Sequence, residues 1–359
     1  MDAIALHRDE DGPRRIDLPR PEPSPGEALV RTLRVGIDGT DHEVISGGHG
    51  TFPEGSDHLV LGHEAVGVVV DANDTALDEG DVVAPTVRRP APDGTGNEYF
   101  ARGEPDMAPA GTYHERGIVG ANGYMAEYFV SPARDLVTLP ERLAERGFLV
   151  EPLSISEKAF EHAYASRSAF DWTPESAMVL GNGALGLLTL GMLVETRGIA
   201  PDRAYCLGRR DRPDPTIDVI EELGATYVDS RTTPVVDVPD RYEAMDLVYE
   251  ATGFARHAFD TVEALAPNGV GALVGVPSPW KFEVDGGALH RDLVLSNKAL
   301  VGTVNSNVSH FEAATTTLDA LPEWLLDAVV TDVVPVEEFP QAFREDDATI
   351  KTAIEFSEL

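Results

Sequence analysis

A glycine-rich turn between an apolar strand and an apolar helix is the feature that most narrows what this chain can fold into. Residues 177–181 (AMVLG) have the pattern of a buried strand, and GNGALG at 181–186 follows it directly and opens a helical segment. In such a unit the glycines permit the tight turn, the close approach of a pyrophosphate and tight helix packing. Because the helix N-terminus then faces the phosphates, the turn predicts a dinucleotide site. A glycine-rich turn without a ligand is the alternative.

Strand and helix patterns alternate through the second half of the chain. Helical spacing appears at 155–165, and apolar strand patterns separated by helical stretches stand at 177–181, 204–208, 245–253 and 270–277. Near-continuous apolar strands that alternate with helices predict an α/β fold with a doubly wound parallel sheet. One more helix is expected around 309–328, and the tail KTAIEF is expected to form a strand.

The first part of the chain has a β-rich pattern. Short apolar runs at 27–35, 64–72 and 81–87 are separated by Gly, Pro and Asp turns. Residues 88–117 are rich in Gly, Pro and acidic groups and are expected to form an irregular lobe. At 359 residues, two domains with separate cores are expected.

The charge balance excludes several kinds of partner. The chain has 28 Lys plus Arg against 62 Asp plus Glu, a net charge of −34, and its basic residues are not clustered. Such a polyanion repels nucleic acids and anionic membrane surfaces. Lysine occurs only at 158, 281, 298 and 351, while 42% of the residues are hydrophobic. An acidic, lysine-poor surface around a real core indicates adaptation to molar salt; an ordinary acidic bacterial protein is the alternative.

The cysteine count and the amino terminus indicate a reducing compartment. Cys206 is the single cysteine, which excludes a disulfide framework and a cysteine-rich zinc cluster, and it is expected to pack in the core. The amino terminus is charged and has no apolar core of a secretory signal. We therefore expect a cytoplasmic protein.

The end of the second strand of the alternation indicates which dinucleotide binds. An acidic residue there would hold the ribose hydroxyls of NAD, but the strand ends in Arg209 and Arg210. Two adjacent guanidinium groups suit the 2′-phosphate of NADP, with NAD as a secondary cofactor. A surface salt bridge with Asp211 or Asp214 is the alternative. By the switch-point rule, 274–276 should line the nicotinamide side.

Polar residues gather where strands of the β-rich half end. Three separated segments, 38–42, 62–64 and 151–153, offer Asp38, His63 and Glu151. Two carboxylates and an imidazole can make a catalytic zinc site with one open position. Taken alone, His63 could be a structural histidine and Asp38 a turn residue.

Several motifs resemble those of a known family. Gly62-His63-Glu64 with Gly67 and Val70, the 181–186 turn and the closing Ile350-Lys351-Thr352 are similar to zinc-dependent medium-chain alcohol dehydrogenases along essentially the whole chain. The segments 38–41, 151–158 and 302–305 resemble the archaeal glucose dehydrogenases most. The resemblance implies a GroES-like catalytic domain over 1–155, completed by 307–359, and a Rossmann domain over 156–306, with the active site in the cleft between them.

The resemblance also implies roles for individual residues. The metal ligands would be Asp38, His63, Glu64 and Glu151, Glu64 binding directly or through water. Catalytic roles would fall to Thr40, His63 and Glu64, and substrate contacts to Thr40, Glu64, Glu115, Glu151 and Asn305. Cofactor contacts, including those inferred above from the turn and strand ends, would be made by Gly181, Asn182, Gly183, Ala184, Leu185, Gly186, Arg209, Arg210, Val274, Gly275, Val276, Thr303, Val304 and Asn305.

The implied reaction is oxidation of D-glucose and related aldoses at C1 to the lactone, with NADP and one zinc ion. Two departures matter: the lobe lacks the family's four structural-zinc cysteines, and Asp38 stands where most of the superfamily has cysteine. The first implies no structural zinc, and the second a harder site that could accept manganese or cobalt. A homodimer is expected, with a tetramer as the alternative. Competing interpretations are another zinc polyol or alcohol dehydrogenase, a metal-free quinone reductase, and a non-enzymatic NADPH-binding protein.

Overall fold

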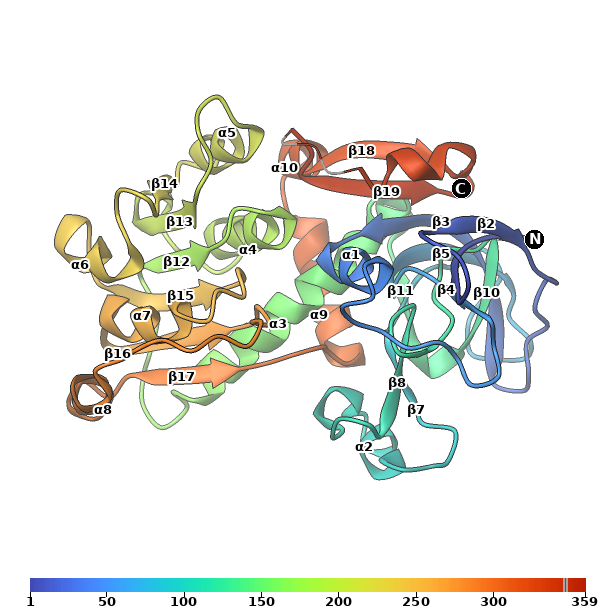
Figure 1. The fold of residues 1–359 in the computed structure, drawn as a ribbon, viewed down its shortest axis with the longest axis horizontal. Coiled ribbons are helices and arrows are strands. Elements are labelled where there is room, and N and C mark those ends of the chain that lie inside the picture. The colour runs from blue at the N-terminus through green and yellow to red at the C-terminus, as the bar shows by residue number, and fades with distance from the viewer. Residues whose placement is uncertain (345, 347) are drawn as a thin grey trace. The chain divides into compact units, whose positions relative to one another are not determined.

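Two units divide the protein (Figure 1). The computed structural model describes residues 1–344, 346 and 348–359. Unit 1 comprises Met1–Ser154, Asn305–Asp319 and Val330–Leu359, and unit 2 comprises Ile155–Val304 and Ala320–Val329. The sequence-based division assigned all of 307–359 to the first domain, whereas the contacts group Ala320–Val329 with unit 2.

Unit 1 is β-rich, as the sequence pattern predicted; most of its strand pairs are antiparallel, but β18 pairs with β19 and β8 with β9 in parallel. The main sheet has the order β11-β6-β5-β3-β19-β18, and β10 also pairs with β3. Two smaller sheets have the orders β2-β1-β4 and β7-β8-β9. The strands are β1 (Asp2–His7), β2 (Arg14–Asp17), β3 (Glu27–Ile37), β4 (His58–Val60), β5 (Glu64–Asp71), β6 (Val82–Pro85), β7 (Arg88–Pro90), β8 (Tyr113–Arg116), β9 (Gly120–Ala121), β10 (Tyr128–Pro132), β11 (Leu136–Leu139), β18 (Val330–Pro335) and β19 (Lys351–Glu355).

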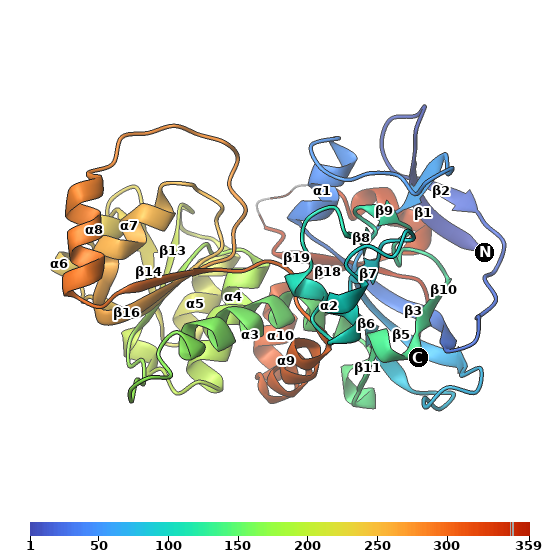
Figure 2. The same cartoon turned by 90° about the horizontal axis from the view of Figure 1, so that it is seen from below.

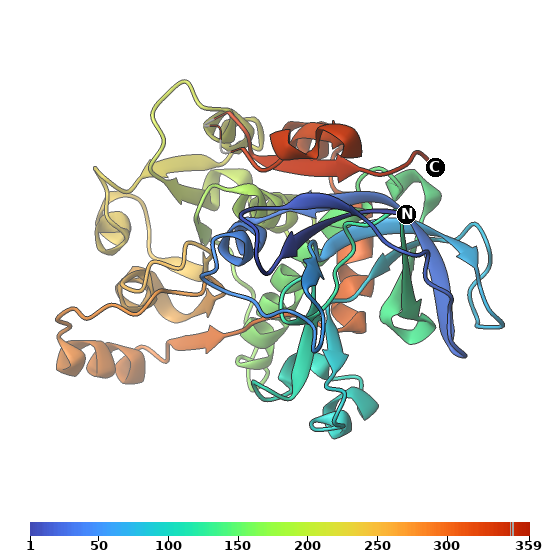
Figure 3. The same ribbon diagram turned by 45° about the vertical axis from the view of Figure 1, so that its right-hand side comes forward.

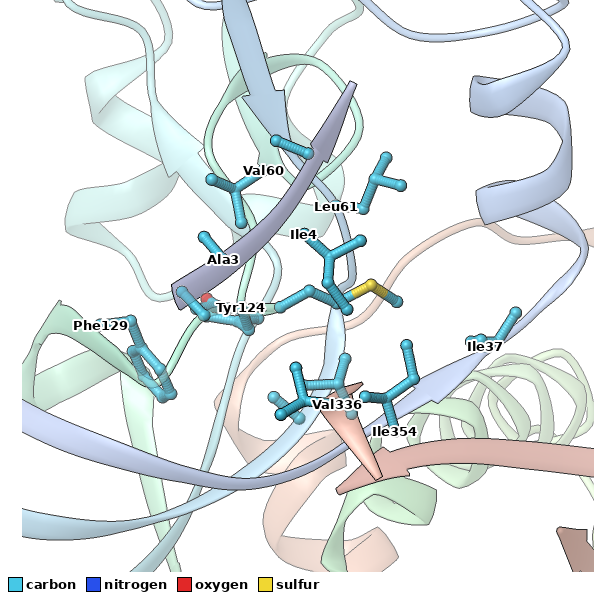
Figure 4. Close-up of a cluster of buried hydrophobic side chains, with 14 of the residues drawn as sticks. Ala3, Ile4, Ile37, Val60, Leu61, Tyr124, Phe129, Val336 and Ile354 are labelled. Carbon is cyan, nitrogen blue, oxygen red and sulfur yellow. The ribbon is translucent and has the colours of Figure 1, made fainter. Parts of the chain in front are cut away.

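The core of unit 1 joins residues from both ends of the chain. Figure 4 shows Ile4, Tyr124 and Phe129 packed with Val336 and Ile354, all of them buried. The red C-terminal strand β19 runs antiparallel beside the blue β3 (Figure 3). Because Val35 and Ile37 of β3 and Ile354 of β19 are buried in this core, the pairing closes it and also brings the start of β19 beside the end of β3.

Unit 2 contains the doubly wound sheet that the alternation predicted. Its strands pair in parallel in the order β14-β13-β12-β15-β16-β17. Figure 2 shows helices α7 and α8 on one side of the sheet and α4 and α5 on the other. The order reverses between β12 and β15, so a crevice for a ligand is expected at their carboxyl ends. The strands are β12 (Ala177–Leu180), β13 (Ala204–Gly208), β14 (Thr226–Asp229), β15 (Met245–Glu250), β16 (Leu265–Leu273) and β17 (Ala299–Gly302).

The helices follow local sequence signals. Helix α1 is capped by Asp38, and α5 by Asp214 with a proline in its first turn. The helices are α1 (Gly39–Ile45), α2 (Asn97–Ala101), α3 (Val150–Ala165), α4 (Ala184–Glu195), α5 (Pro215–Glu222), α6 (Val238–Arg241), α7 (His257–Ala264), α8 (Gly286–Leu295), α9 (Val308–Ala320) and α10 (Glu323–Val329). Among the residues described, no helix is both long and apolar enough to span a bilayer.

Two expectations of local structure need correction. The single helix expected around 309–328 is wrong: α9 and α10 are separate, and Pro322 lies at the break because proline cannot continue a helix. The lobe at 88–117, expected to be irregular, contains strands β7 and β8, the short helix α2 and a 3₁₀ turn, η1 (Pro105–Met107). The β7–β8 pairing sets Arg88 opposite Glu115, which orders this lobe.

Candidate metal centre and nucleotide site

The loop after β3 holds Asp38 rigidly at the start of α1. The Asp38 Oδ1 atom accepts a hydrogen bond from Asp41 N at 3.0 Å, and Asp41 Oδ2 accepts one from Asp38 N at 3.1 Å. Thr40 Oγ1 also donates to Asp38 Oδ2 at 3.1 Å. This reciprocal cap satisfies two backbone N–H groups that a helix start leaves unpaired. The cap therefore fixes both carboxylates and sets the Thr40 hydroxyl beside one of them.

The four predicted metal ligands come together in unit 1. His63 directly precedes β5, Glu64 is its first residue, and Glu151 lies in the first turn of α3. Ligand atoms of His63, Glu64 and Glu151 lie within 4.8 Å of one another, as do those of Asp38, Asp41 and His63. The Nε2 atom of His63 is 3.6 Å from Asp38 Oδ2. Residues more than a hundred positions apart thus meet around His63, which belongs to both groups of oxygen and nitrogen donors; Asp38 is partly exposed and the other four residues are buried.

Asp41 belongs to this cluster, although no role was predicted for it. Its carboxylate is buried, and Oδ1 lies 4.0 Å from Nδ1 of His63, on the side of the ring away from Asp38. The two atoms are too far apart for a hydrogen bond, so Asp41 acts on His63 through its charge, which raises the pKa of the imidazole. The sequence contained a signal for the position of Asp41. Asp38 and Asp41 are three residues apart at a helix start, which is the spacing of a reciprocal cap.

Lys351 is the second unpredicted member. It opens β19, is 4% exposed and forms an ion pair with Glu64 Oε2. A side chain on Gly36 would collide with the Glu64 carboxylate, so this glycine makes room for the pair. Lys351 and a metal ion would therefore compete for the carboxylate of Glu64, one of the four predicted ligands. Lys351 is one of only four lysines in the chain, which was the signal in the sequence.

Burial and mutual charge shift the pKa values of this cluster. Burial raises the pKa of Glu151 to about 8 and that of Asp41 to about 7. Burial by itself would lower the pKa of His63, but the carboxylates of Asp38, Asp41 and Glu151 together raise it well above the usual value. Burial opposes ionisation of Asp38 as well, yet the charge of His63 lowers its pKa. In the metal-free protein the cluster therefore holds protons at neutral pH.

The donor set fits a divalent zinc ion. Within the part of the chain that the structure describes, His63 Nδ1 and Asp41 Oδ1 are buried without a hydrogen-bond partner. Several buried carboxylates around one imidazole are costly unless a cation compensates them. Imidazole nitrogen and carboxylate oxygen are both ligands that zinc accepts, and a set this rich in oxygen is hard enough for manganese as well.

The zinc affinity of the cluster is expected to rise with pH. Glu151, with a pKa of about 8, and His63, with a raised pKa, hold protons that a metal ion must displace. A group with a raised pKa is protonated below that value, so binding is weaker there and strengthens as the pH rises through about 8. Calorimetric zinc titration of the metal-free protein at several pH values, in buffers of different ionisation heat, measures both affinity and proton release. A flat profile with no proton release would contradict the expectation.

The glycine turn in unit 2 has the geometry of a phosphate-binding turn. Gly181 has a φ of 115°, a conformation that glycine adopts freely. A side chain on Gly186 would collide with the Gly181 carbonyl, so its absence lets α4 pack onto the turn. The position where Gly183 would carry a Cβ has no atom within 4 Å. The middle of the turn is therefore open, at a helix N-terminus without a side-chain cap.

The two adjacent arginines lie at the end of β13. Arg209 is exposed, and the backbone N–H of Arg210 donates to the Tyr227 hydroxyl at 2.8 Å. The Arg210 Nε atom lies 3.9 Å from Asp214, so this part of the salt-bridge alternative is present. Asp211 pairs instead with Arg231, which follows β14. Arg231 was not predicted, because strand pairing alone brings its segment to β13.

The remaining predicted cofactor residues lie at the ends of β16 and β17. Gly275 approaches the backbone of Gly253 so closely that a side chain there would collide with it. Thr303 Oγ1 is buried without a hydrogen-bond partner among the described residues. The carbonyl of Val304 accepts a hydrogen bond from Lys158 Nζ at 3.0 Å, and Asn305 follows with a φ of 57°. Their contacts with a cofactor stay predictions.

Comparisons with known proteins agree with this geometry. Residues 24–141 match the alcohol dehydrogenase GroES-like domain, and residues 144–356 match the glucose dehydrogenase C-terminus. Glucose 1-dehydrogenase of Haloferax mediterranei is 71% identical over 358 residues, which cover 99% of both chains. Glucose 1-dehydrogenase of Haloarcula marismortui is 64% identical over 359 residues, which cover 100% of both chains.

Solved structures give the same result. The structure of Haloferax mediterranei glucose dehydrogenase in complex with NADP, Zn and gluconolactone matches with a TM-score of 0.97 and 70% identity over 100% of both chains. The 2R,3R-butanediol dehydrogenase of Bacillus subtilis, 22% identical with a TM-score of 0.79 over 99% of both chains, shares the fold.

The chain is a medium-chain dehydrogenase of the zinc alcohol dehydrogenase superfamily. Three features define this class: a GroES-like unit, a parallel sheet with a glycine turn, and carboxylates gathered around a buried histidine. Within that superfamily, the chain belongs to the glucose dehydrogenase family. The predictions of the fold class and of the family are confirmed.

Proposed function

We propose that this chain oxidises D-glucose and related aldoses at C1 to the lactone, with NADP as the electron acceptor and one zinc ion per subunit. The observation that carries the proposal is full-length similarity, at 70% identity, to a glucose dehydrogenase solved with NADP, Zn and gluconolactone. The two groups of possible ligands that share His63 support the metal requirement, because carboxylates gathered around a buried imidazole are costly unless a cation compensates them.

Asp38, His63 and Glu151 would hold the zinc ion, with Glu64 as a direct or water-mediated ligand. When bound, zinc supplies a Lewis acid that polarises the C1 hydroxyl of the sugar. The Thr40 hydroxyl, already bonded to Asp38 Oδ2, accepts the proton of that hydroxyl and relays it. The Asp41 carboxylate, 4.0 Å from Nδ1 of His63, stabilises positive charge on the imidazole.

Unit 2 would bind the cofactor, which takes the hydride from C1. The open glycine turn receives the pyrophosphate, and Arg209 and Arg210 hold the 2′-phosphate that distinguishes NADP from NAD. NAD is expected to serve as a secondary cofactor. The protein's contribution to the chemical step is alignment of the two reacting carbons.

Hydroxyl recognition would fall to carboxylates and one amide of unit 1. Glu64, Glu115, Glu151 and Asn305 offer acceptors for sugar hydroxyls. A site built to pair with hydroxyls rejects a substrate that lacks one, because its own buried groups are then left without partners. This gives discrimination among aldoses that an apolar pocket could not supply.

A homodimer formed through unit 2 is the assembly that we propose. β17 is an edge strand with one side unpaired in the described sheet, and such an edge invites pairing with another chain. Val294 and Leu295 in the neighbouring α8 are exposed. In molar salt, screening of the net charge of −34 permits two such faces to meet.

One experiment tests the function together with its salt dependence. We expect glucose to be oxidised with NADP faster than with NAD, and activity to fall when potassium chloride is lowered from about 3 M to about 0.1 M, where self-repulsion is screened less. A panel of aldoses and simple polyols, assayed with and without chelator dialysis, measures each requirement. Full activity after complete metal removal would rule out the zinc mechanism. A preference for polyols over aldoses would rule out the substrate assignment.

A further inference from the structure

Arg88, at the start of β7, is a buried cation, and each of its three guanidinium nitrogens donates a hydrogen bond. It is 3% exposed. Its Nε atom donates to Glu115 Oε1 at 3.0 Å, Nη1 donates to the carbonyl of Asp106 at 3.0 Å and to that of Pro105 at 3.4 Å, and Nη2 donates to the Tyr113 hydroxyl at 2.9 Å. The guanidinium group also lies 3.7 Å from the Tyr113 ring centroid. One side chain thus ties together both strands and the 3₁₀ turn of the lobe.

This burial is costly for a structural contact alone. A guanidinium group removed from water loses its hydration, and its hydrogen bonds must replace that loss. The Glu115 side chain, 12% exposed, supplies the opposite charge directly across the strand pair. A charge-assisted hydrogen bond of this kind orients the carboxylate more strongly than a neutral one would. Arg88 therefore determines where the Glu115 carboxylate lies.

The turn after Glu115 is packed against the metal-binding segment. A Cβ added to Gly117 would lie 2.5 Å from the carbonyl oxygen of Gly62, the residue before His63. The two backbones can approach this closely only because residue 117 has no side chain and adopts a positive φ. The Glu115 carboxylate is thus held on a segment that contacts the metal-binding loop.

The same guanidinium group is linked to a second predicted sugar ligand. The Asp106 side chain, next to the carbonyl that Arg88 binds, accepts a hydrogen bond from Asn307 Nδ2 at 3.1 Å. Asn307 lies two residues after Asn305, and the Ser306 hydroxyl between them bonds the hydroxyl of Ser154 at 2.6 Å. Arg88 therefore supports the segments that carry Glu115 and Asn305 in unit 1.

We infer that Arg88 is a positioning residue that sets sugar discrimination, by holding the Glu115 carboxylate through Oε1 so that Oε2 meets a sugar hydroxyl. The inference rests on the proposed role of Glu115 as a sugar ligand. The inference also gives a function to the lobe at 88–117, which has no cysteine. The buried guanidinium group organises this lobe, in place of a disulfide or a zinc ion held by cysteines.

The test compares Arg88→Met, Arg88→Lys, Glu115→Gln and the Arg88→Met/Glu115→Gln double variant in the full-length enzyme. Wild type should discriminate against one monodeoxyglucose, the one lacking the hydroxyl that Glu115 meets. Glu115→Gln and Arg88→Met should each raise the glucose KM by about 10- to 100-fold and remove discrimination against that same analogue. The double variant should be no worse than the single ones, since both changes remove one interaction. Arg88→Lys keeps the positive charge but not the planar, multiply donating guanidinium group. Its glucose KM should therefore lie between that of wild type and that of Arg88→Met.

The matched control is Arg102→Met, in the same lobe. Arg102 also pairs with a glutamate and lies over a tyrosine ring, but it is exposed. This variant should keep wild-type kinetics, and the NADP KM and zinc content should be unchanged in every variant.

Each outcome decides the matter. If Arg88→Met keeps wild-type discrimination while Glu115→Gln loses it, the inference about Arg88 fails and the role of Glu115 stands. If Glu115→Gln has no effect on any deoxy sugar, the proposed sugar contact itself fails. A loss of kcat and zinc that is equal for all sugars in Arg88→Met and Arg88→Lys would reduce Arg88 to a structural residue. Where the methionine variant does not fold, the lysine variant carries the same comparison.

Discussion

His63→Ala is expected to lose zinc and to lose turnover with glucose by more than about 1,000-fold, while it still binds NADPH. The reason is that His63 contributes to both groups of ligand atoms in the cluster and is the imidazole ligand among carboxylates. Without it, the carboxylates lose the nitrogen donor that favours zinc, and the polarised C1 hydroxyl loses several kcal/mol of stabilisation. Zinc content by atomic absorption, steady-state kinetics and NADPH fluorescence measure the three quantities separately.

His49→Ala is the control for this experiment. His49 is exposed, and it has no metal-ligand spacing in the sequence, so its replacement should leave zinc content and kinetics unchanged. If His63→Ala retained wild-type turnover, the metal assignment would be refuted. If it also lost NADPH binding, the variant would be misfolded; His63→Gln, which keeps a polar group of similar size, then tests the same role.

Replacing both Arg209 and Arg210 by alanine is expected to reverse the cofactor preference. Each charge-assisted contact to the 2′-phosphate contributes about 1.5–3 kcal/mol, so kcat/KM with NADP should fall by about 100-fold or more. NAD has no 2′-phosphate, so kcat/KM with NAD should change little. The measured quantity is the ratio of the two specificity constants.

Arg256→Ala is the matched control, because Arg256 is an exposed arginine of the same unit that pairs with Asp260. It should keep the NADP preference. The alternative interpretation of Arg210, as a partner of Asp214 at 3.9 Å, predicts a different result. In that case the double variant would lose stability, and activity would fall equally with both cofactors.

Local patterns were enough to predict much of the fold. The strands expected at 27–35, 64–72 and 81–87 correspond to β3, β5 and β6, and the helix–strand alternation gave the parallel sheet. Periodicity predicts these elements well because each depends on which faces its own side chains bury. Helix ends were harder: the break between α9 and α10 was missed although Pro322 marks it.

The candidate ligands could also be named from the sequence, because Asp38, His63, Glu64 and Glu151 match motif positions. Their partners could not. Asp41, Lys351 and Arg88 acquire roles only through neighbours that are distant in the chain or on another strand. Lys351 reaches Glu64 because β19 pairs with β3 while β3 also pairs with β5. No local periodicity contains that information.

The sequence by itself determined the class of fold, the glycine turn, the residue types of the proposed metal ligands and the acidic composition, because each depends on residue chemistry or short-range spacing. Tertiary structure alone decided the electrostatic state of the site. The pKa values of His63 and Glu151 depend on burial and on carboxylates from other segments, and the orientation of Glu115 depends on a guanidinium group across a strand pair. Such interactions fall off within a few ångströms, so they exist only once the chain has folded.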